Sequence, residues 1–464
     1  MSLIQLLSVT ILLCLLMLYL LRQFWLRSHY PSGWLPLPTI GSLWQAGIRL
    51  YQETLSKLKE QHGISKTSTT PYGSIPDEND LVFSDGDIWK QQREVGQLML
   101  STQEEGKKGV ESQVEEEAPR LVKTFARVNG QPFDPLNAIT TSICKMVWTM
   151  TFGHRSPLED KEGQQVTDAI ESAVKSGGSF VYALHKQFPC LMRYFPGPHK
   201  NALSSKELVL SFTKKAIKKH KEAEAMKEPQ DFTDFYLLQM EKKQSKAGHN
   251  SAYNEENLAE CILDFLISGT ESSAITLQWA LLLMASHPDI QDKVHKEMEK
   301  ILGSSNSVSY QDWKKLPYTS AVIHEIQRTK HAFLFRIIKQ CAKDVNVFGF
   351  LAPKGTFINP DLNSVFLDSK LWETPEKFNP SHFLDKDGQF VAREEFQVLA
   401  TGSDVSLEDK LARAELFIFF TNLLKTFVFQ LPEGEEKPSK EPRTGLITYP
   451  HSYKICAVPH CKTS

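Results

Sequence analysis

The segment from Phe396 to Phe420 contains a loop of small residues that could bring backbone close to a flat ligand. Ala-Thr-Gly-Ser at 400–403 includes Gly402 and leads into a helix predicted from Leu407 to about Lys425, because apolar residues surround most of that stretch. Glycine has no Cβ, so its backbone can approach a ligand closely. From the residues alone, the segment predicts a loop before a buried core helix, and a ligand site is the less common interpretation.

Two further pairs of residues have the spacing of neighbours on a helix. Trp89 and Arg93 are four residues apart, and Glu325 and Arg328 are three apart, so each pair shares a helix face. Packing or a cation–π contact would account for the first pair. An isolated exposed pair of the second kind stabilises a helix by only roughly a few tenths of a kcal/mol. Neither pair indicates chemistry by itself.

Small hydroxylated residues interrupt the middle of the longest predicted helix. Asn254 is a suitable N-cap, and the helix is predicted to run from it to about Ser286. Its middle reads Ser268-Gly-Thr-Glu-Ser-Ser273, and such residues weaken a helix. The pattern alone therefore favours a kink or a close crossing with another helix. Amphipathic helices are also predicted over 288–302 and 318–330.

Taken together and in this order, the motifs resemble those of the cytochrome P450 monooxygenases. The haem loop of that family reads Phe, two residues, Gly, a residue, Arg, a residue, Cys, a residue, Gly. The Leu-Ala-Arg-Ala-Glu-Leu-Phe run at 411–417 is close to that of animal family 2 members and fixes the register. In that register Gly402 matches the first Gly of the pattern. The other positions differ: Leu399 replaces Phe, Asp404 replaces Arg, Ser406 replaces the axial Cys, and Glu408 replaces the second Gly.

The resemblance implies a haem b cofactor and residues that would hold it. In the family, the pair matched by Trp89 and Arg93 donates to a haem propionate. Lys339 stands where the family uses an Arg on a propionate, so the charge is kept but the bidentate fork is lost. Leu399 and Gly402 belong to the haem-binding loop, and Ser406 occupies the position of the metal ligand, which a serine hydroxyl fills poorly.

The same resemblance assigns catalytic and structural roles. Glu271 and Ser272 match the acid and hydroxyl that relay protons at the haem site, with Ser272 in place of the usual Thr. Glu325 and Arg328 match the ExxR motif, which locks the core around the haem loop. His382, in Phe378-Asn-Pro-Ser-His-Phe383, stands at the position of their third partner.

Composition narrows the possible environment of the chain. It has 464 residues and a formal net charge of −2, which gives no indication of a nucleic-acid partner. The seven cysteines include no pair with zinc-finger or CxxC spacing, which indicates reduced thiols in a cytosol-facing protein. None lies between Cys341 and Cys456, so no thiol is close in sequence to the 402–408 loop.

The N-terminal sequence predicts a membrane anchor. Residues 3–21 are uncharged and about as long as the ~20 residues of a typical transmembrane helix. Arg22 and Arg27 follow, so the bulk of the chain is expected on the cytosolic side. A cleaved signal peptide is the alternative, but the basic n-region and the small-x-small site are missing. The prediction is a single-pass signal-anchor over 1–27 in the endoplasmic reticulum membrane, a Pro-rich hinge over 28–45, and a cytochrome P450-like domain over 46–464.

The predicted fold is mainly α with a smaller β region: the cytochrome P450 fold plus the N-terminal transmembrane helix. Residues 103–119 are charge-dense and predict a solvated helix, 133–153 a helix with an apolar stripe, and 203–228 a basic helix. Short strands are expected over 345–350 and 357–359, with a final hairpin over 445–459. The chain reaches Trp89 soon after Gly63, which predicts an incomplete first sheet relative to the family.

Three functions are compatible with these residues. The first is a membrane-anchored family member, nearest the branch that oxidises arachidonate and related fatty acids, whose oxygen-activating chemistry is lost or weakened by Ser406. The second is an active family 2 monooxygenase with an unusual axial ligand. The third is a non-enzymatic, membrane-anchored binding module. The partners are NADPH-cytochrome P450 reductase, as the resemblance implies, the lipid bilayer and, if the chain acts on a substrate, a small apolar molecule; no nucleic acid is expected.

Overall fold

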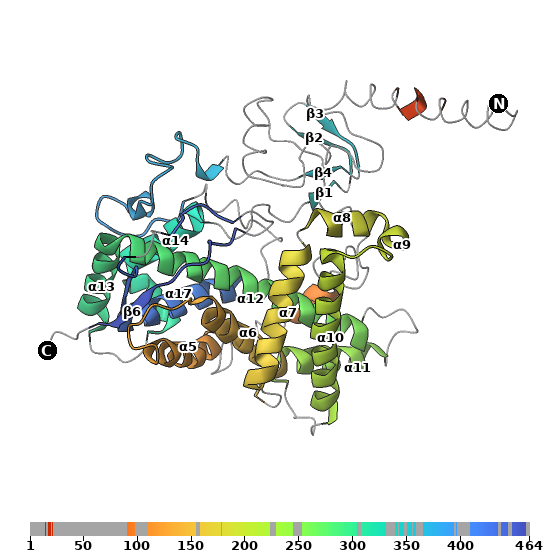
Figure 1. Cartoon of the computed structure of the whole chain (residues 1–464), viewed down its shortest axis with the longest axis horizontal. Coiled ribbons are helices and arrows are strands. Elements are labelled where there is room, and N and C mark those ends of the chain that lie inside the picture. The colour runs from red at the N-terminus through yellow and green to blue at the C-terminus, as the bar shows by residue number, and fades with distance from the viewer. Residues whose placement is uncertain are drawn as a thin grey trace, which may run out of the picture.

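Helices make up most of the structure and surround one long helix, α12 (Figure 1). The computed structural model describes residues 91–97, 110–154, 158–177, 179–222, 229–244, 253–303, 308–330, 339–341, 343–347, 350–354, 356–358, 365–393, 409–434, 438–443 and 448–460, with positions 14, 17–19, 21 and 396. The predicted predominance of helix over strand is confirmed within these residues.

The described helices and strands have the following bounds in chain order. The helices are α5 Val110–Ala126, α6 Leu136–Phe152, α7 Asp160–Gly177, α8 Phe180–Gln187, α9 Pro189–Met192, α10 Pro198–Glu222, α11 Phe232–Gln244, α12 Glu255–Ser286, α13 Pro288–Leu302, α14 Pro317–Thr329 and α17 Asp409–Thr426, with 3-10 turns η1 Tyr310–Lys315 and η2 Pro380–Phe383. The strands are β1 Lys339–Gln340, β2 Val345–Val347, β3 Phe350–Ala352, β4 Phe357–Ile358, β5 Phe427–Gln430 and β6 Cys456–Pro459.

Helix α12 has the start and end expected from its sequence. The Asn254 side chain accepts a hydrogen bond from the backbone N–H of Asn257 at 2.8 Å, which confirms the predicted N-cap. In the middle of the helix, a Cβ placed on Gly269 would lie 3.2 Å from Cγ2 of Val147 on α6. The small residue thus permits a close approach of two helices, which confirms the interpretation of this stretch as a helix crossing.

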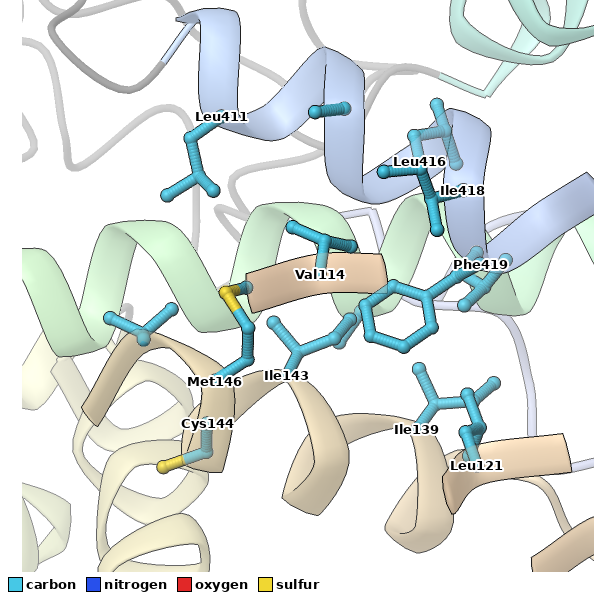
Figure 2. Close-up of a cluster of buried hydrophobic side chains, with 14 of the residues drawn as sticks. Val114, Leu121, Ile139, Ile143, Cys144, Met146, Leu411, Leu416, Ile418 and Phe419 are labelled. Carbon is cyan, nitrogen blue, oxygen red and sulfur yellow. The ribbon is translucent and has the colours of Figure 1, made fainter. Parts of the chain in front are cut away.

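Helix α17 is buried in the core, as its apolar residues predicted. Five of its side chains are fully buried: Ala414, Ile418, Phe420, Leu423 and Leu424. The helix packs against α5 and α12. Figure 2 shows its side chains in one cluster with those of α5 and α6. This burial holds in place the helix that directly follows the 402–408 loop in sequence.

Helix α5 differs from its prediction. A solvated helix was expected over 103–119, whereas α5 spans Val110–Ala126 and packs one face against α6 and α17. Val114, Ala118, Leu121 and Phe125 are at most 1% exposed and recur at helical spacing. Charged residues between them dominate the composition of this stretch and hide the apolar stripe in the sequence.

The β structure consists of short antiparallel pairs. β1 pairs with β4, β2 with β3, and β5 with β6 among the described residues. The final hairpin predicted over 445–459 is wrong in its pairing: β6 bonds to β5, with Phe427 opposite Pro459. β5 begins directly after α17, so the C-terminal strand is joined to the core helix. The expected incomplete first sheet concerns residues outside the described part.

The predicted membrane anchor lies mostly outside the described residues. Cys14, Leu21 and positions 17–19 are helical. Among the described residues, none of the helices combines the length and apolar character needed to cross a bilayer. The anchor over 1–27 and the hinge over 28–45 stay predictions.

Candidate functional site

Several of the predicted site residues fall outside the described part of the structure. They are Trp89, Leu399, Gly402, Asp404, Ser406 and Glu408. Lys339 is described only as backbone, in β1 opposite Ile358. The described part of the site comprises Arg93, the middle of α12 and the network around Arg328.

Arg93 lies on a short helical stretch, residues 91–97, beside the start of α12. The Tyr253 hydroxyl donates to the backbone carbonyl of Gln91 at 2.8 Å, and Sγ of Cys261 lies 3.4 Å from Oε1 of Gln92. These two contacts bring the predicted propionate-binding Arg93, which is half-buried, to the N-terminal half of α12. Its role toward a haem stays a prediction.

The hydroxyl groups in the middle of α12 bond within the helix. Ser272 Oγ donates to the carbonyl of Ser268 at 2.8 Å, and Ser268 Oγ donates to that of Asp264 at 2.6 Å. Thr276 Oγ1 donates to the carbonyl of Ser272 at 2.7 Å. Such bonds to the preceding turn satisfy the donors and leave hydroxyl lone pairs as acceptors. Asp264, Ser268 and Ser272 form a half-buried line along one face of α12.

Glu271 is next to Ser272 in sequence but is almost completely buried, with 3% of its surface exposed. The Tyr449 hydroxyl donates to its Oε2 at 2.6 Å. Burial raises the pKa of Glu271 to about 7, the hydrogen bond from Tyr449 acts in the opposite direction, and nearby Glu171 raises it further. Tyr449 was not identified from the sequence, because it lies 178 residues from Glu271 and belongs to no motif.

Helix α12 is also joined directly to α17. Ser273 Oγ donates a hydrogen bond to Oε2 of Glu415, and both residues are buried. Glu415 belongs to the Leu-Ala-Arg-Ala-Glu-Leu-Phe run that sets the register of the preceding loop. The contact ties the small-residue patch of α12 to the helix that follows Ser406.

Arg328 is the centre of a buried polar network at the end of α14. Its Nε and Nη2 donate to the two carboxylate oxygens of Glu325 at 2.7 and 2.8 Å. The remaining N–H groups donate to backbone carbonyls: Nη1 to Phe366 at 2.6 Å and Pro375 at 2.9 Å, and Nη2 to Lys377 at 3.1 Å. The guanidinium has five N–H donors, so all of them are used. The network fixes the 366–377 backbone against α14.

The Glu325 carboxylate and His382 complete the network. Oε1 of Glu325 accepts from the backbone N–H of Asn379 at 2.8 Å and lies 3.2 Å from Nδ1 of His382. The backbone N–H of Thr374 donates to Nε2 of His382 at 3.3 Å. An Nε2 acceptor leaves the proton on Nδ1, which then donates to Glu325. The structure thus brings together Glu325, Arg328 and His382, the three residues predicted to form the structural lock.

One aromatic residue covers this network. The Trp372 ring lies 5.0 Å from the Arg328 guanidinium carbon and 5.5 Å from that of Arg393, measured to the ring centroid. Arg393 Nε also donates to the backbone carbonyl of His382 at 2.9 Å. Trp372 is 1% exposed, so water is kept from the ion pair on this side. No sequence motif singled out Trp372 or Arg393.

Comparison with known proteins points to one family over most of the chain. The family model "Cytochrome P450" matches residues 31–457. The chain is 37% identical to Cytochrome P450 2J5 of Mus musculus over 414 residues, 89% of this chain and 81% of the relative. It is 36% identical to Cytochrome P450 2J2 of Homo sapiens over 437 residues, 94% of this chain and 86% of the relative. It is 32% identical to Cytochrome P450 2C23 of Rattus norvegicus over 479 residues, 96% of this chain and 97% of the relative.

These matches extend over all the helices described above, from α5 to α17, and over the buried network of Glu325, Arg328 and His382. The relatives are family 2 members at similar levels of identity, which agrees with the amino-acid sequence of the 411–417 run. The chain belongs to the cytochrome P450 monooxygenase family, whose members bind haem.

Proposed function

We propose that this chain is a family 2 type cytochrome P450 whose oxygen-activating chemistry is lost or severely weakened. One observation carries the proposal: Ser406 stands where the family has its axial Cys, three residues before α17 begins at Asp409. Two structural facts support the register: α17 is buried as the family's helix would be, and Glu415 in the diagnostic run bonds to Ser273 of α12.

The donor set does not fit a haem-thiolate centre. In this family, an axial thiolate donates electron density that favours O–O cleavage. A serine hydroxyl has a far higher pKa than a thiol, so it would offer a weak neutral oxygen. Cys144, buried in α6, is a poor substitute because burial raises the pKa of its thiol to about 11. No reaction step is therefore assigned to the haem in this chain.

Other positions around the cofactor would weaken its binding. Asp404 places a carboxylate where the family has an Arg near a propionate, so the local charge is reversed. Glu408 replaces a glycine of the tight turn, where a side chain is poorly tolerated. Lys339 can still provide a positive charge, without the two parallel bonds of an Arg.

The residues that form the helical core and the buried network around a haem site are retained. The Glu325–Arg328–His382 network has its hydrogen bonds in place, and α12 and α17 are joined in the core. By resemblance, Arg93 and Trp89 would meet the propionates, Leu399 and Gly402 would lie in the haem loop, and Glu271 and Ser272 would line the distal side. Haem b is thus the cofactor to test for, although the thiolate is missing.

Two other functions lead to different spectra. An active family 2 monooxygenase with another strong axial ligand would bind haem and reduce it with electrons from NADPH-cytochrome P450 reductase, acting on a small apolar substrate. A non-enzymatic binding module in the endoplasmic reticulum membrane would carry no haem. For all three functions, the signal-anchor over 1–27, the Pro-rich hinge over 28–45 and the cytochrome P450-like domain over 46–464 belong to the proposal, with the bulk of the chain facing the cytosol.

A reduced CO-difference spectrum of the purified full-length chain, with its haem content measured, tests the proposal. We expect either substoichiometric haem or a band shifted from the family's thiolate position toward that of histidine-ligated haem. A full-height band at the thiolate position would overturn the proposal and favour the active monooxygenase. A complete absence of haem would favour the binding module.

A further inference from the structure

The acid of the α12 patch is bonded to a residue from the far end of the chain. The Tyr449 hydroxyl donates to Oε2 of Glu271 at 2.6 Å, while Oε1 of the same carboxyl is buried and has no hydrogen-bond partner among the residues that the structure describes. A buried carboxyl with only one of its oxygens bonded is costly. The single hydrogen bond from Tyr449 is therefore the main polar contact that determines where this side chain lies.

Tyr449 is itself held in position by contacts that do not involve Glu271. The indole N–H of Trp279 donates to the backbone carbonyl of Thr448 at 2.6 Å, and the Tyr453 hydroxyl donates to the backbone carbonyl of Gln278 at 2.6 Å. Trp279 and Gln278 lie about two turns along α12 from Glu271. The segment from Thr448 to Tyr453 is thus fastened to α12 on either side of Tyr449's own contact.

Glu271 and its neighbours in sequence have different surroundings, because consecutive residues of a helix point in different directions. Ser268 and Ser272 lie on the half-buried face of α12, whereas the carboxyl of Glu271 is covered, with Cys144 of α6 and Glu171 of α7 among its electrostatic neighbours. Arg443 is the cation that acts on Tyr449 from its own segment. The Ser268 and Ser272 hydroxyls donate within the helix, to the carbonyls of Asp264 and Ser268.

We propose that Tyr449 is a positioning residue whose hydroxyl holds the Glu271 carboxyl in the core and away from the α12 face that carries Ser268 and Ser272. This inference deepens the proposed function, on which it rests for its consequence. In a family member, the acid and the neighbouring hydroxyl act at the same site, so their separation here is a second impairment, independent of Ser406. Repair of the axial position alone would leave it in place.

The test compares two tyrosine-to-phenylalanine substitutions in the full-length chain. Tyr449→Phe removes the hydroxyl that bonds to Glu271, and Tyr453→Phe removes a hydroxyl from the same segment that bonds to α12 without touching Glu271. The readout is the infrared carbonyl band of protonated Glu271, identified by its loss in Glu271→Gln and followed over a pH titration. This readout does not require bound haem.

In the unsubstituted chain, the band is expected to titrate with a midpoint about 7. Once Tyr449→Phe frees the carboxyl to turn toward the half-buried Ser268 and Ser272, it loses part of the burial that raises its pKa, so the midpoint should fall from about 7 toward the ordinary value of 4.5. Tyr453→Phe should leave it in place. A crystal structure of Tyr449→Phe should show the carboxyl turned toward Ser268 or Ser272.

An unchanged or raised midpoint in Tyr449→Phe, or a carboxyl that stays where it is, would overturn the inference. If Tyr449→Phe does not fold, the unsubstituted chain still decides the matter: titration of Glu271 near its ordinary value of 4.5 would contradict the buried position. A thiolate-type CO spectrum would defeat the proposed function and leave the Tyr449 contact intact, so the two failures can be told apart.

Discussion

Glu325 and Arg328 lie one turn apart on α14 and meet through two parallel hydrogen bonds, Nε to Oε2 at 2.7 Å and Nη2 to Oε1 at 2.8 Å, with both side chains 0% exposed. An exposed pair at this spacing contributes little to stability. A buried pair is different, because the loss of one partner leaves a charge without compensation in the core. The same two residue types thus contribute differently to the stability of the fold when the 366–377 backbone buries them.

Arg328→Lys should destabilise the fold by about 1–3 kcal/mol, the cost of leaving buried acceptors without their donors. Lysine keeps the charge but cannot donate to two oxygens of Glu325 and three carbonyls at once. The measurement is urea unfolding of the full-length chain. Lys296→Ala is the control, since its pair with Asp292 is exposed and should change stability by at most about 1 kcal/mol. Equal effects of the two substitutions would contradict the interpretation of the network.

The sequence predicted α12, α13 and α17 well, because their apolar periodicity and caps are local properties. Asn254 and Ser286 bound α12 as expected. The sequence also indicated which residues form the buried network around Arg328, but only through the family motif. The spacing of three residues between Glu325 and Arg328 does not by itself predict that the pair is buried. What determines the burial is the 366–382 segment, whose carbonyls and His382 arrive from elsewhere in the chain.

Contacts between distant segments could not be predicted. Tyr449 meets Glu271 from 178 residues away, and β6 pairs with β5 rather than with its own neighbours. Neither contact has a periodic or compositional signal, since each depends on how the C-terminal segment packs over α12. The stripe on α5 was missed for another reason: charged residues between Val114 and Leu121 dominate its composition.

Two glycine substitutions should change stability in opposite directions. A Cβ at Gly269 in α12 would lie 3.2 Å from Cγ2 of Val147, a buried β-branched side chain with little freedom to rotate in a helix. A Cβ at Gly163 in α7 would meet the flexible end of Lys145 at 3.3 Å. Gly163→Ala should therefore gain up to about 1 kcal/mol from helix propensity.

Gly269→Ala should lose roughly 1–2 kcal/mol in spite of the same propensity gain, because the crossing of α6 and α12 becomes too tight. Thermal unfolding of both variants, side by side, measures the difference. Val147→Ala should relieve part of the loss when combined with Gly269→Ala, since it removes the atom in contact. Stabilisation by Gly269→Ala alone would mean that the two helices can separate at this point.

The free energy of unfolding should depend on pH through the titration of Glu271. Its folded pKa is raised to about 7, above the ordinary value of 4.5, so the folded state holds a proton that the unfolded state releases between these values. The contribution is fully present below pH 4.5 and is lost as the pH rises through about 7. Its size is roughly 3 kcal/mol, from 1.36 kcal/mol per pKa unit.

Glu271→Gln removes this titration. The difference in unfolding free energy between Glu271→Gln and the unsubstituted chain should therefore grow in favour of the variant from pH 4.5 to above pH 7. Urea unfolding at a series of pH values measures it, and the comparison cancels the contributions of other groups. A difference that stays constant over this range would show that folding does not raise the pKa of Glu271 above its ordinary value of 4.5.

Ser406→Cys alone should not restore monooxygenase turnover. The substitution supplies a thiol at the axial position, but Asp404 and Glu408 would still place two carboxylates in the loop. The shortened stretch after Gly63 would also remain, and Tyr449 would still hold Glu271 away from Ser272. The expected result is at most partial recovery of a thiolate-type CO band, with no recovery of product formation in the presence of reductase and NADPH.

The informative comparison adds the neighbouring residues in steps. Ser406→Cys combined with Asp404→Arg and Glu408→Gly rebuilds the family's loop pattern, and it should raise the thiolate band more than Ser406→Cys alone, because the charge near the propionate and the tight turn are both restored. A chimera that lengthens the stretch after Gly63 tests the remaining loss separately. Full turnover from the single substitution would mean that the impairment lies in one atom, the missing sulfur, rather than in the whole distal and proximal surroundings of the cofactor.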